Sequence, residues 1–372
     1  MSVGSRKGSE GTAGFECGRR GTAVAEKDLL LRDFWYLALP SRQLKAGQMM
    51  GKMLLGEPVL LGRASDGAPF AIRDICAHRG MPLHHGRFDG AEVTCCYHGW
   101  KFAPDGRCTE VPSLLPDQAS IASRIRVKSY PCRDVQGNTW VFIPDGEVRE
   151  SEPLPDVPRM PGVGDTAPQV SCSLRYPLDA DDAAYTLMDP AHAAFVHTWW
   201  WWKKKGRKLR DKQKDFEPAP LGWRQKRHAA PADNRIYRLF GKNVTTEITY
   251  RLPGMRIESI QGDRHSAVSL LIITPLSKTE IEIHQCLYWT LSWLAPLRPL
   301  FSRLVHNFLD QDRKIALLQQ EGLRFDPPLM LFGDVDAQAK WFFQLKREWL
   351  RARQENRPFR NPIEPQTLRW RS

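Results

Sequence analysis

The chain has 372 residues, of which 42% are apolar and 10% aromatic, and its formal net charge at pH 7 is +12. This composition is globular, and the length suits two domains, or one large domain with an added module. Basic residues are dispersed in short runs instead of lying on one element with stacking aromatics, which argues against nucleic-acid binding. An acidic redox partner or an anionic membrane surface accounts better for the charge.

Residues 1–27 consist mainly of Gly, Ser, Arg, Lys and Glu, and predict a disordered leader. This segment lacks the apolar core of a secretory signal, and no later window reaches the roughly 18 uncharged apolar residues of a spanning helix. The eight cysteines are scattered without the spacing of a disulfide framework. We therefore expect a cytoplasmic protein in which clustered Cys and His side chains bind metal.

From residue 34 to 145, short apolar stretches alternate with Gly, Pro and Asp, which predicts a small all-β domain. Residues 146–168 are rich in Pro, Gly and acidic residues and predict a linker. A second domain is expected at 169–350, followed by a basic tail at 351–372.

The second domain mixes predicted helices and strands. Residues 180–198 look helical, and 244–250, 267–273 and 280–289 read as strands, the first and last with the alternation of a sheet that has one covered face. Residues 296–322 predict a long amphipathic helix. The expected fold class is α+β, with an N-terminal β module.

One motif pairs Cys76 and His78 with Cys95 and His98, and sixteen residues separate the two halves. Two thiolates suit one iron of a [2Fe–2S] cluster and two imidazoles suit the other, which raises its potential to roughly −150 to +300 mV, against about −400 mV for plant-type ferredoxins. Cys96 also lies in the motif, but Cys95 has the two-residue spacing to His98.

Zinc is the alternative metal for this motif. Zinc also binds Cys2His2 sets, but it typically pairs two Cys in one loop and two His in a helix, whereas here each loop carries a mixed pair. Gly80, Gly99 and Gly106 permit tight loops, and Pro112 lies in a third loop that would shield a cluster. With Trp100 after Gly99, the motif resembles the Rieske domain of the ring-hydroxylating oxygenase family over residues 34–145.

A second motif runs from Asp189 through His192 to His197 in an otherwise apolar segment. It resembles the family's Asp-x-x-His-x4-His pattern, in which both His bind a mononuclear Fe(II). On an ideal helix, five residues turn about 500° and leave the two rings about 140° apart. The helix must therefore be bulged or bent here.

The carboxylate of a 2-His-1-carboxylate triad should come from Asp310 or Asp312, which point to nearly opposite sides of a predicted helix. Asp312 shares an apolar stripe with Phe301, Val305, Phe308 and Ile315. Asp310 neighbours His306, Arg313 and Lys314 at ion-pair spacing. A carboxylate on an apolar stripe needs a partner that offsets its loss of water. A bound metal is the best such partner, so we predict Asp312 as the metal ligand. The alternative is that Asp312 forms a buried ion pair with an Arg.

The resemblance implies a helix-grip (START-like) catalytic domain and, by analogy, a homotrimer. In the family, the residue matching Asp189 bridges a Rieske His of a neighbouring subunit to an iron-ligating His. Asp189 before Pro190 also reads as a helix N-cap, and both roles are compatible. Tyr185 stands where some relatives have Asn, a departure that affects the surroundings of the iron and not its presence.

The implied activity is that of an oxygenase component. A separate ferredoxin or reductase would supply electrons from NAD(P)H, because the chain has no flavin or nicotinamide fingerprint, and the iron would activate O2 to hydroxylate or demethylate an organic substrate. Four Trp and three Lys at 199–205 suit a bilayer interface, although half core and half exposed loop is an alternative. The interface reading predicts peripheral contact with the inner membrane, a bulky polycyclic or sterol-like substrate, and monooxygenation over dioxygenation.

Two other functions fit parts of the pattern. One is an electron-transfer protein in which a Rieske domain is fused to a lipid-binding domain without mononuclear iron. The other is a colourless, zinc-stabilised binding protein. The ligand residues do not distinguish monooxygenation, dioxygenation and demethylation, because these reactions share one iron site.

Overall fold

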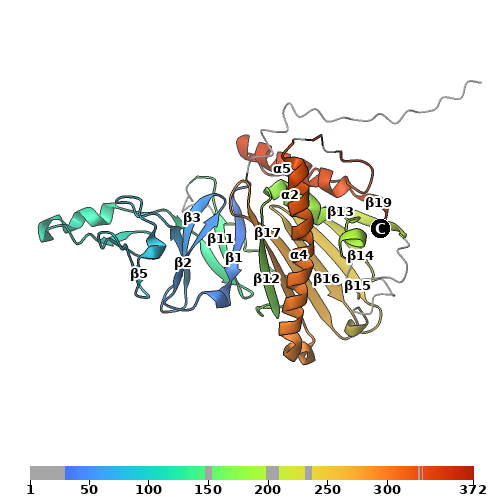
Figure 1. Cartoon of the computed structure of the whole chain (residues 1–372), viewed down its shortest axis with the longest axis horizontal. Helices are drawn as coiled ribbons and strands as arrows, with labels where there is room; N and C mark the ends of the chain where they lie inside the picture. Colours follow the sequence, from blue (N-terminus) through green and yellow to red (C-terminus); the bar gives the residue numbers. More distant parts are fainter. Residues whose placement is uncertain (1–29, 147–152, 198–208, 231–236, 326, 329) are drawn as a thin grey trace, which may run out of the picture.

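The computed structural model describes residues 30–146, 153–197, 209–230, 237–325, 327–328 and 330–372. The predicted leader at 1–27 and the aromatic and basic run at 199–205 lie outside these residues. The described chain forms an elongated molecule, with the N-terminal module at one end and a second module built on a large sheet at the other (Figure 1).

The N-terminal module is all-β apart from short 3-10 turns, as predicted. One sheet has the order β1-β11-β10, a second β2-β3-β4-β9 and a third β5-β6-β7-β8. The strands are β1 (Phe34–Pro40), β2 (Met49–Leu54), β3 (Glu57–Arg63), β4 (Pro69–Arg73), β5 (Arg87–Phe88), β6 (Val93–Thr94), β7 (Lys101–Phe102), β8 (Cys108–Glu110), β9 (Ser129–Tyr130), β10 (Cys132–Val135) and β11 (Asn138–Ile143).

In its described residues, the second module is one eight-stranded antiparallel sheet with four α-helices and two 3-10 helices, η4 (Tyr237–Phe240) and η5 (Ser292–Leu297). Its strand order is β12-β18-β17-β16-β15-β14-β13-β19. The strands are β12 (Val170–Tyr176), β13 (Asp211–Ala219), β14 (Gly222–Ala229), β15 (Thr245–Arg251), β16 (Met255–Gln261), β17 (Ser266–Pro275), β18 (Ile281–Trp289) and β19 (Gln366–Arg371). The helices are α2 (Ala180–Met188), α3 (Ala193–Val196), α4 (Arg298–Leu323) and α5 (Ala337–Gln354). The α+β prediction, with an antiparallel sheet and a long helix, is confirmed.

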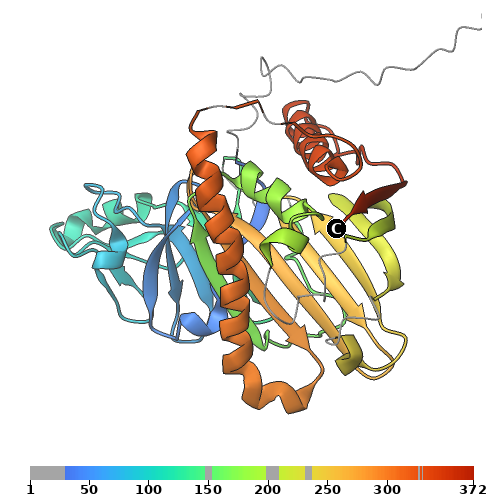
Figure 2. The same ribbon diagram turned by 45° about the vertical axis from the view of Figure 1, so that its right-hand side comes forward.

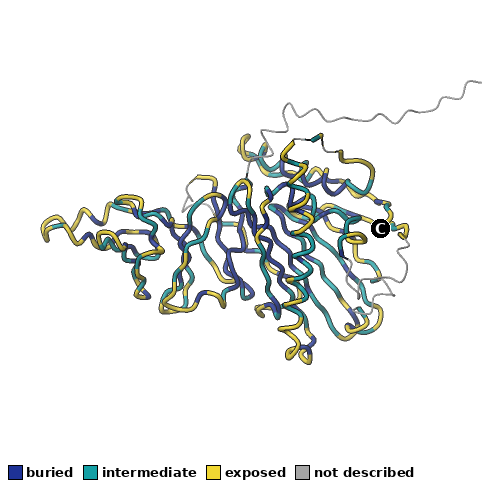
Figure 3. The backbone as a smooth tube through the Cα atoms, in the orientation of Figure 1, coloured by how far each residue is buried: buried dark blue, intermediate teal, exposed yellow. Residues whose placement is uncertain are grey.

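The large sheet separates two apolar layers, because successive side chains of a strand point to opposite faces. On one face, residues such as Ile257 and Leu270 pack against Trp35 and Trp140 of the N-terminal module. On the other face, residues such as Leu271 pack beneath the helices, and α4 crosses this face in front of the strands (Figure 2). Figure 3 shows the buried backbone concentrated where the two modules meet.

The two modules are joined by hydrogen bonds as well as by apolar contacts. The Thr274 hydroxyl donates to the Leu37 carbonyl over 2.9 Å, and Asn138 Nδ2 donates to the Tyr288 hydroxyl over 2.8 Å. Trp35 Nε1 donates to the Pro155 carbonyl over 2.7 Å. The described part of the predicted linker, from residue 153, therefore packs along the module boundary and is not a free tether.

Two elements differ from the sequence-based prediction. The predicted helix 180–198, expected to be bulged or bent at the two His, is interrupted outright: α2 ends at Met188 and only Ala193–Val196 is helical again. The predicted tail 351–372 contains β19, which pairs antiparallel with β13 and buries Leu368 completely. Charged residues dominate this strand's exposed face and hid its alternation, so the second module extends to residue 371.

We predict that removing one partner of the buried ion pair between α2 and α5 strongly destabilises the fold. Lys346 Nζ lies 2.7 and 2.8 Å from the two carboxylate oxygens of Asp181, and both side chains are only 4% exposed. Lys346→Met should lower the free energy of unfolding by about 3–5 kcal/mol, because it leaves a buried charge without this partner.

Thermal melting followed by circular dichroism measures this effect. The double variant Asp181→Leu/Lys346→Met should recover most of the loss, since neither charge then remains. Arg159→Met, which breaks a pair that is 60% and 81% exposed, should change the stability by less than about 1 kcal/mol. Equal losses in the single and double variants would contradict the prediction.

Candidate metal centres

The first centre lies on two loops of the same shape at the outer end of the N-terminal module. In each loop the N–H of the cysteine, Cys76 or Cys95, donates to the carbonyl five residues later over 2.8 Å. The N–H of Gly80 or Gly99, four residues after each cysteine, donates to that cysteine's carbonyl over 3.0 Å. Both glycines have φ of 72°, a conformation that other residues rarely adopt.

These loops place the four predicted ligands as two pairs. Cys76 and Cys95 are 2% and 3% exposed, and burial, together with the Cys95 thiol beside it, raises the pKa of Cys76 to about 11. The rings of His78 and His98 lie 4.6 Å apart between centroids, and His98 is exposed. A buried thiol pair with an outer imidazole pair fits a cluster in which each pair binds its own iron.

The polar atoms of this centre also indicate a missing partner. Nδ1 of His78 is buried and makes no hydrogen bond, although buried ring nitrogens are normally paired. The Trp100 ring stacks on His78 at 4.6 Å with an interplanar angle of 1° and fixes the imidazole. The donor set and the unpaired nitrogen therefore fit a bound iron–sulfur cluster.

The second centre brings His192, His197 and Asp312 together beneath α4. Nε2 of His192 lies 3.9 Å from Asp312 Oδ1, and Nε2 of His197 lies 3.5 Å from the same oxygen. In the part of the chain that the structure describes, this is the one group of three or more potential ligands whose atoms all lie within 4.8 Å of one another. The Cys/His motif does not converge in this way, as a single zinc would require.

The break in the helix explains how two His five positions apart reach one point. His192 precedes the first residue of α3 and His197 follows its last, so the two rings do not lie on one regular helix. Asp189 is the C-cap residue that follows α2, and its Oδ1 accepts a hydrogen bond from the N–H of Ala191 over 2.7 Å. Asp189 therefore stabilises the turn between the helices, but it is not the N-cap of α3.

The remaining ring nitrogens of this centre are oriented by oxygen acceptors. Nδ1 of His192 donates to the Asp189 carbonyl over 2.8 Å, and the Asp189 carboxylate lies 3.7 Å from the same nitrogen. Nδ1 of His197 donates to Oε1 of Gln311 over 3.2 Å. A proton on each Nδ1 leaves the lone pair of Nε2 directed at the shared point, as in metal-bound histidines.

Asp312 and Asp310 have the two environments that the helix periodicity predicted. Asp310 pairs with Arg313 over 2.6 Å and with Lys314 over 2.9 Å, whereas Asp312 faces the two imidazoles. The predicted apolar stripe was wrong at Ile315, which is 43% exposed. The buried positions are Leu309 and Ala316, three and four residues from Asp312, so the stripe is rotated away from Ile315.

Sequence reasoning did not foresee the contacts of two residues at this centre, although it placed Phe308 on the stripe of Asp312. The Phe308 ring stacks on His197 at 3.9 Å between centroids, and Gln311 contacts a side chain 114 positions earlier in the chain. No local signal marks Gln311, because its role depends on helix packing. Tyr185, the departure from the family pattern, accepts a hydrogen bond from Gln319 over 2.9 Å and joins α2 to α4.

Burial sets the protonation of the metal-free triad. It raises the pKa of Asp312 to about 7, lowers that of His197 to about 4, and is the main cause of the lowered pKa of His192. His197 is therefore neutral at pH 6, whereas much of Asp312 carries a proton that a metal must displace.

We predict that the affinity of this centre for Fe(II) rises by about tenfold per pH unit between pH 5 and 7 and then levels off, because one proton leaves Asp312 on binding. Anaerobic calorimetry in buffers of different ionisation enthalpy should show about one proton released at pH 6 and almost none at pH 8.5. The control Asp310→Asn should keep this profile. A flat profile would show that Asp312 is not protonated in the metal-free protein.

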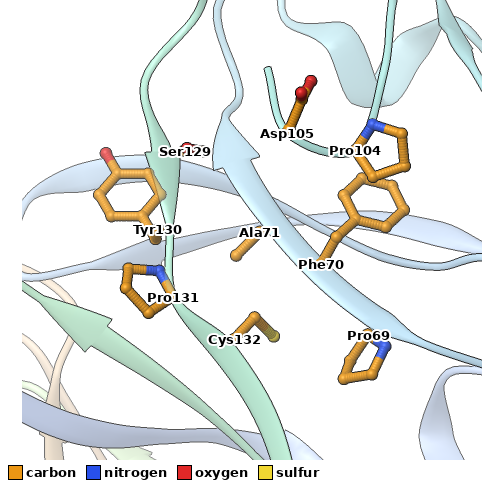
Figure 4. Close-up of a pocket in the computed structure, with 9 residues that line it drawn as sticks. All are labelled: Pro69, Phe70, Ala71, Pro104, Asp105, Ser129, Tyr130, Pro131 and Cys132. Carbon is orange, nitrogen blue, oxygen red and sulfur yellow. The ribbon is translucent and has the colours of Figure 1, made fainter. Parts of the chain in front are cut away.

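Two cavities among the described residues lie in the N-terminal module. Figure 4 shows the first, of about 360 Å³, between Phe70 of β4, Pro104 and the Tyr130–Cys132 segment. The second, of about 340 Å³, is lined by the cluster residue Cys76 and by three cations, Arg73, Arg126 and Lys128. A positively charged recess thus adjoins the first centre.

Comparison with protein families decides the nature of the N-terminal module, because the model for the Rieske [2Fe–2S] domain matches residues 34–131. The chain contains a Rieske [2Fe–2S] domain. The match spans all four Cys and His residues of the first centre, and the predicted resemblance to Rieske oxygenases is confirmed.

The similarity to curated proteins covers less than half of the chain. The chain is 36% identical over 168 residues to chlorophyllide a oxygenase of Chlamydomonas reinhardtii, which is 45% of this chain and 25% of that protein. It is 35% identical over 130 residues to 4beta-methylsterol monooxygenase of Methylococcus capsulatus, 35% of each chain. The matched part thus spans about a quarter to a third of these relatives.

Solved structures extend the similarity of fold to both modules. Dicamba monooxygenase bound to dicamba matches with a TM-score of 0.66 at 18% identity, over 87% of this chain and 98% of that one. The terminal oxygenase of carbazole 1,9a-dioxygenase from Nocardioides aromaticivorans matches with a TM-score of 0.64 at 24% identity, over 87% and 96%. The arrangement of a Rieske domain beside a helix-covered sheet is therefore shared. The predicted cofactors, a [2Fe–2S] cluster and a mononuclear iron, agree with these comparisons.

Proposed function

We propose that the chain is the oxygenase component of a multi-component system that oxidises an organic substrate with O2. The observation that carries the proposal is the convergence of His192, His197 and Asp312 on one point in a chain that also has a Rieske domain. Two neutral imidazoles and one carboxylate are the ligand set of non-haem Fe(II) oxygenases, and they leave metal positions open.

The chain's own residues define what each centre does. We propose Cys76, His78, Cys95 and His98 as the cluster ligands. An iron held by the triad supplies the chemistry that activates O2, and the cluster supplies electrons one at a time. The Asp189 carbonyl and Gln311 keep both imidazoles in the ligating tautomer. Phe308 covers one face of His197 and limits its access to water.

We also propose that electrons pass between subunits of a homotrimer. In one chain the cluster loops lie at the outer end of the Rieske domain and α4 lies in the other module (Figure 1). His98 is exposed, and Asp189, about one-third exposed, contacts the ligand His192. Asp189 is therefore suited to connect the exposed edge of a neighbouring chain's cluster to the iron. By this reading the Rieske domain spans 34–145 and the catalytic module begins at 169.

We propose that an acidic ferredoxin or reductase docks on the charged recess beside Cys76. No ion pair links Arg73 or Arg126 to an acid among the residues that the structure describes, so both charges are available to a partner. Arg73→Glu/Arg126→Glu should slow reduction of the cluster by an acidic ferredoxin about tenfold at low salt, with a smaller difference at high salt.

Stopped-flow bleaching of the cluster absorbance measures this rate. Reduction by dithionite should be unchanged, because a small reductant does not need the docking surface. Arg298→Glu/Arg303→Glu removes two exposed cations of α4 and is the matched control. An equal slowing in the control would place docking elsewhere, or show that only net charge matters.

We propose a bulky apolar polycyclic or sterol-like substrate and favour monooxygenation. Of the relatives, one is named a methylsterol monooxygenase and another the oxygenase subunit of 3-chlorobenzoate-3,4-dioxygenase, so both reaction types occur among them. The described chain has no helix with the length and apolar character that crossing a membrane requires. Peripheral contact with the inner membrane stays a prediction.

The alternative function is electron transfer by a Rieske protein without mononuclear iron. Metal analysis and O2 uptake on purified, reconstituted protein separate the two. The oxygenase should contain three irons per chain, and single-turnover reaction with a reduced cluster should add oxygen to, or remove a methyl group from, one of a panel of lipids and aromatics, as measured by product mass. Two irons and no O2 uptake would leave only the electron carrier.

A further inference from the structure

The helix-facing side of the large sheet is unevenly covered. Ile257, Val268 and Leu270 on the opposite side are buried. On the helix-facing side, β15 to β18 present partly exposed residues, which we name the open strip: Ile248, Arg256, Glu258, Ile260, Ser269 and Leu287. Its mixture of apolar side chains with a few polar groups is typical of a wall that binds an organic ligand.

The register of the strands places the open strip on the same side as the triad. Arg256 pairs with Tyr250 on β15 and with Leu271 on β17, and both partners lie in the core beneath the helices. Directly paired residues share a face of the sheet. In agreement, after burial and the opposing effect of Asp189, the charge of Arg256 contributes to lowering the pKa of His192.

Arg256 and Glu258 form the polar centre of this strip. Nη2 of Arg256 donates to Glu258 Oε2 over 2.9 Å, and the side chains are 22% and 18% exposed. The hydroxyls of Tyr237 and Thr246 each lie 3.4 Å from Glu258 Oε1 and hold the carboxylate. A half-buried pair fixed in this way is pre-organised on the wall.

The pair keeps hydrogen-bonding capacity that the described residues do not use. Nε of Arg256 reaches the Tyr250 hydroxyl over 3.4 Å, but Nη1 has no acceptor in the described chain. Because Glu258 balances the guanidinium charge, a carboxylate ligand would leave a net negative charge in a partly dehydrated site. A hydroxyl can accept from Arg256 and donate to Glu258, and a carbonyl can accept from Arg256, without that cost.

We propose that Arg256 and Glu258 bind an uncharged oxygen substituent, a hydroxyl or carbonyl group, of an otherwise apolar polycyclic substrate and so orient it toward the triad. The role of this site in orienting a substrate for oxidation rests on the proposed function. Binding of the ligand itself does not depend on catalysis. It identifies both residues as determinants of specificity.

Equilibrium binding of three fluorescent probes tests this site: phenanthrene, 9-hydroxyphenanthrene and phenanthrene-9-carboxylate. They are titrated into full-length protein with both metal centres loaded, under nitrogen. The wild type should prefer the hydroxyl compound over phenanthrene, and Arg256→Leu/Glu258→Leu should reduce this ratio of Kd values about tenfold, or about 1.4 kcal/mol. Phenanthrene itself should bind the double variant as before, because its contacts are apolar.

A more conservative variant keeps the proposal testable if the double variant fails to fold. Arg256→Lys keeps the charge and the pairing with Glu258 but removes the fork of donors, and should reduce the ratio by about threefold. An unchanged ratio in both variants, at least tenfold tighter binding of the carboxylate probe by the wild type, or no binding of any probe would each overturn the proposal.

The outcomes also separate this inference from the proposed function. If the ratio changes as expected but no substrate supports O2 uptake, the oxygenase proposal fails and the binding site stands. If O2 uptake is coupled to product but the ratio does not respond to the variants, only the role of Arg256 and Glu258 fails.

Discussion

Asp312→Ala should lower the iron content from three to two per chain and reduce turnover by at least about 100-fold, while the visible spectrum of the Rieske cluster stays unchanged. Even loss of a residue that only supports a metal ligand costs 10- to 100-fold, and Asp312 contributes the one carboxylate among the three grouped side chains. The cluster spectrum is preserved because its four ligands lie in the other module, on loops with their own hydrogen bonds.

The same helix offers a matched control. Asp310→Ala removes a carboxylate of the same size two residues away, which pairs with Arg313 and Lys314 instead of facing the imidazoles. It should keep three irons and nearly full turnover, because ion pairs between residues three and four positions apart on one helix contribute little. Iron analysis with parallel product assays measures both variants. Equal losses of iron and turnover in the two variants would show that α4 tolerates no substitution at these positions. The role of the triad would then be tested with His192→Ala.

Cys95→Ser should abolish the Rieske spectrum and, with it, all turnover that depends on the electron donor. A hard hydroxyl replaces a soft thiolate, which iron–sulfur clusters require. Cys95 is 3% exposed and pairs with Cys76 at the base of the two loops, so no other thiolate stands at its place. Visible absorption and electron paramagnetic resonance of the reduced protein measure the loss.

The adjacent cysteine is the control for this substitution. Cys96 is exposed, so Cys96→Ser should leave the spectrum and the iron content unchanged. Cys95→Ser should still retain one iron per chain at the triad, which distinguishes loss of the cluster from unfolding. A normal cluster in Cys95→Ser, or a missing one in Cys96→Ser, would reverse the choice between the two thiols.

Several features of the second module could not be predicted from the sequence and became visible only in the folded chain. His192 and His197 are 120 and 115 positions from Asp312 by their numbers, and no local pattern encodes such a distance. The contact of Gln311 with His197 and the strand at 366–371 depend on how α4 and the sheet pack. The open strip likewise follows from which face the helices leave uncovered.

The sequence by itself predicted the ligands of the first metal centre and, correctly, the fold class. Cys76, His78, Cys95 and His98 lie within 23 positions, and the loops that hold them close through hydrogen bonds to residues four and five positions away. The choice of Asp312 over Asp310 also followed from the sequence, because helical periodicity alone separates two residues two positions apart. Local geometry is encoded by neighbouring residues, whereas the convergence of distant side chains requires the packed tertiary structure.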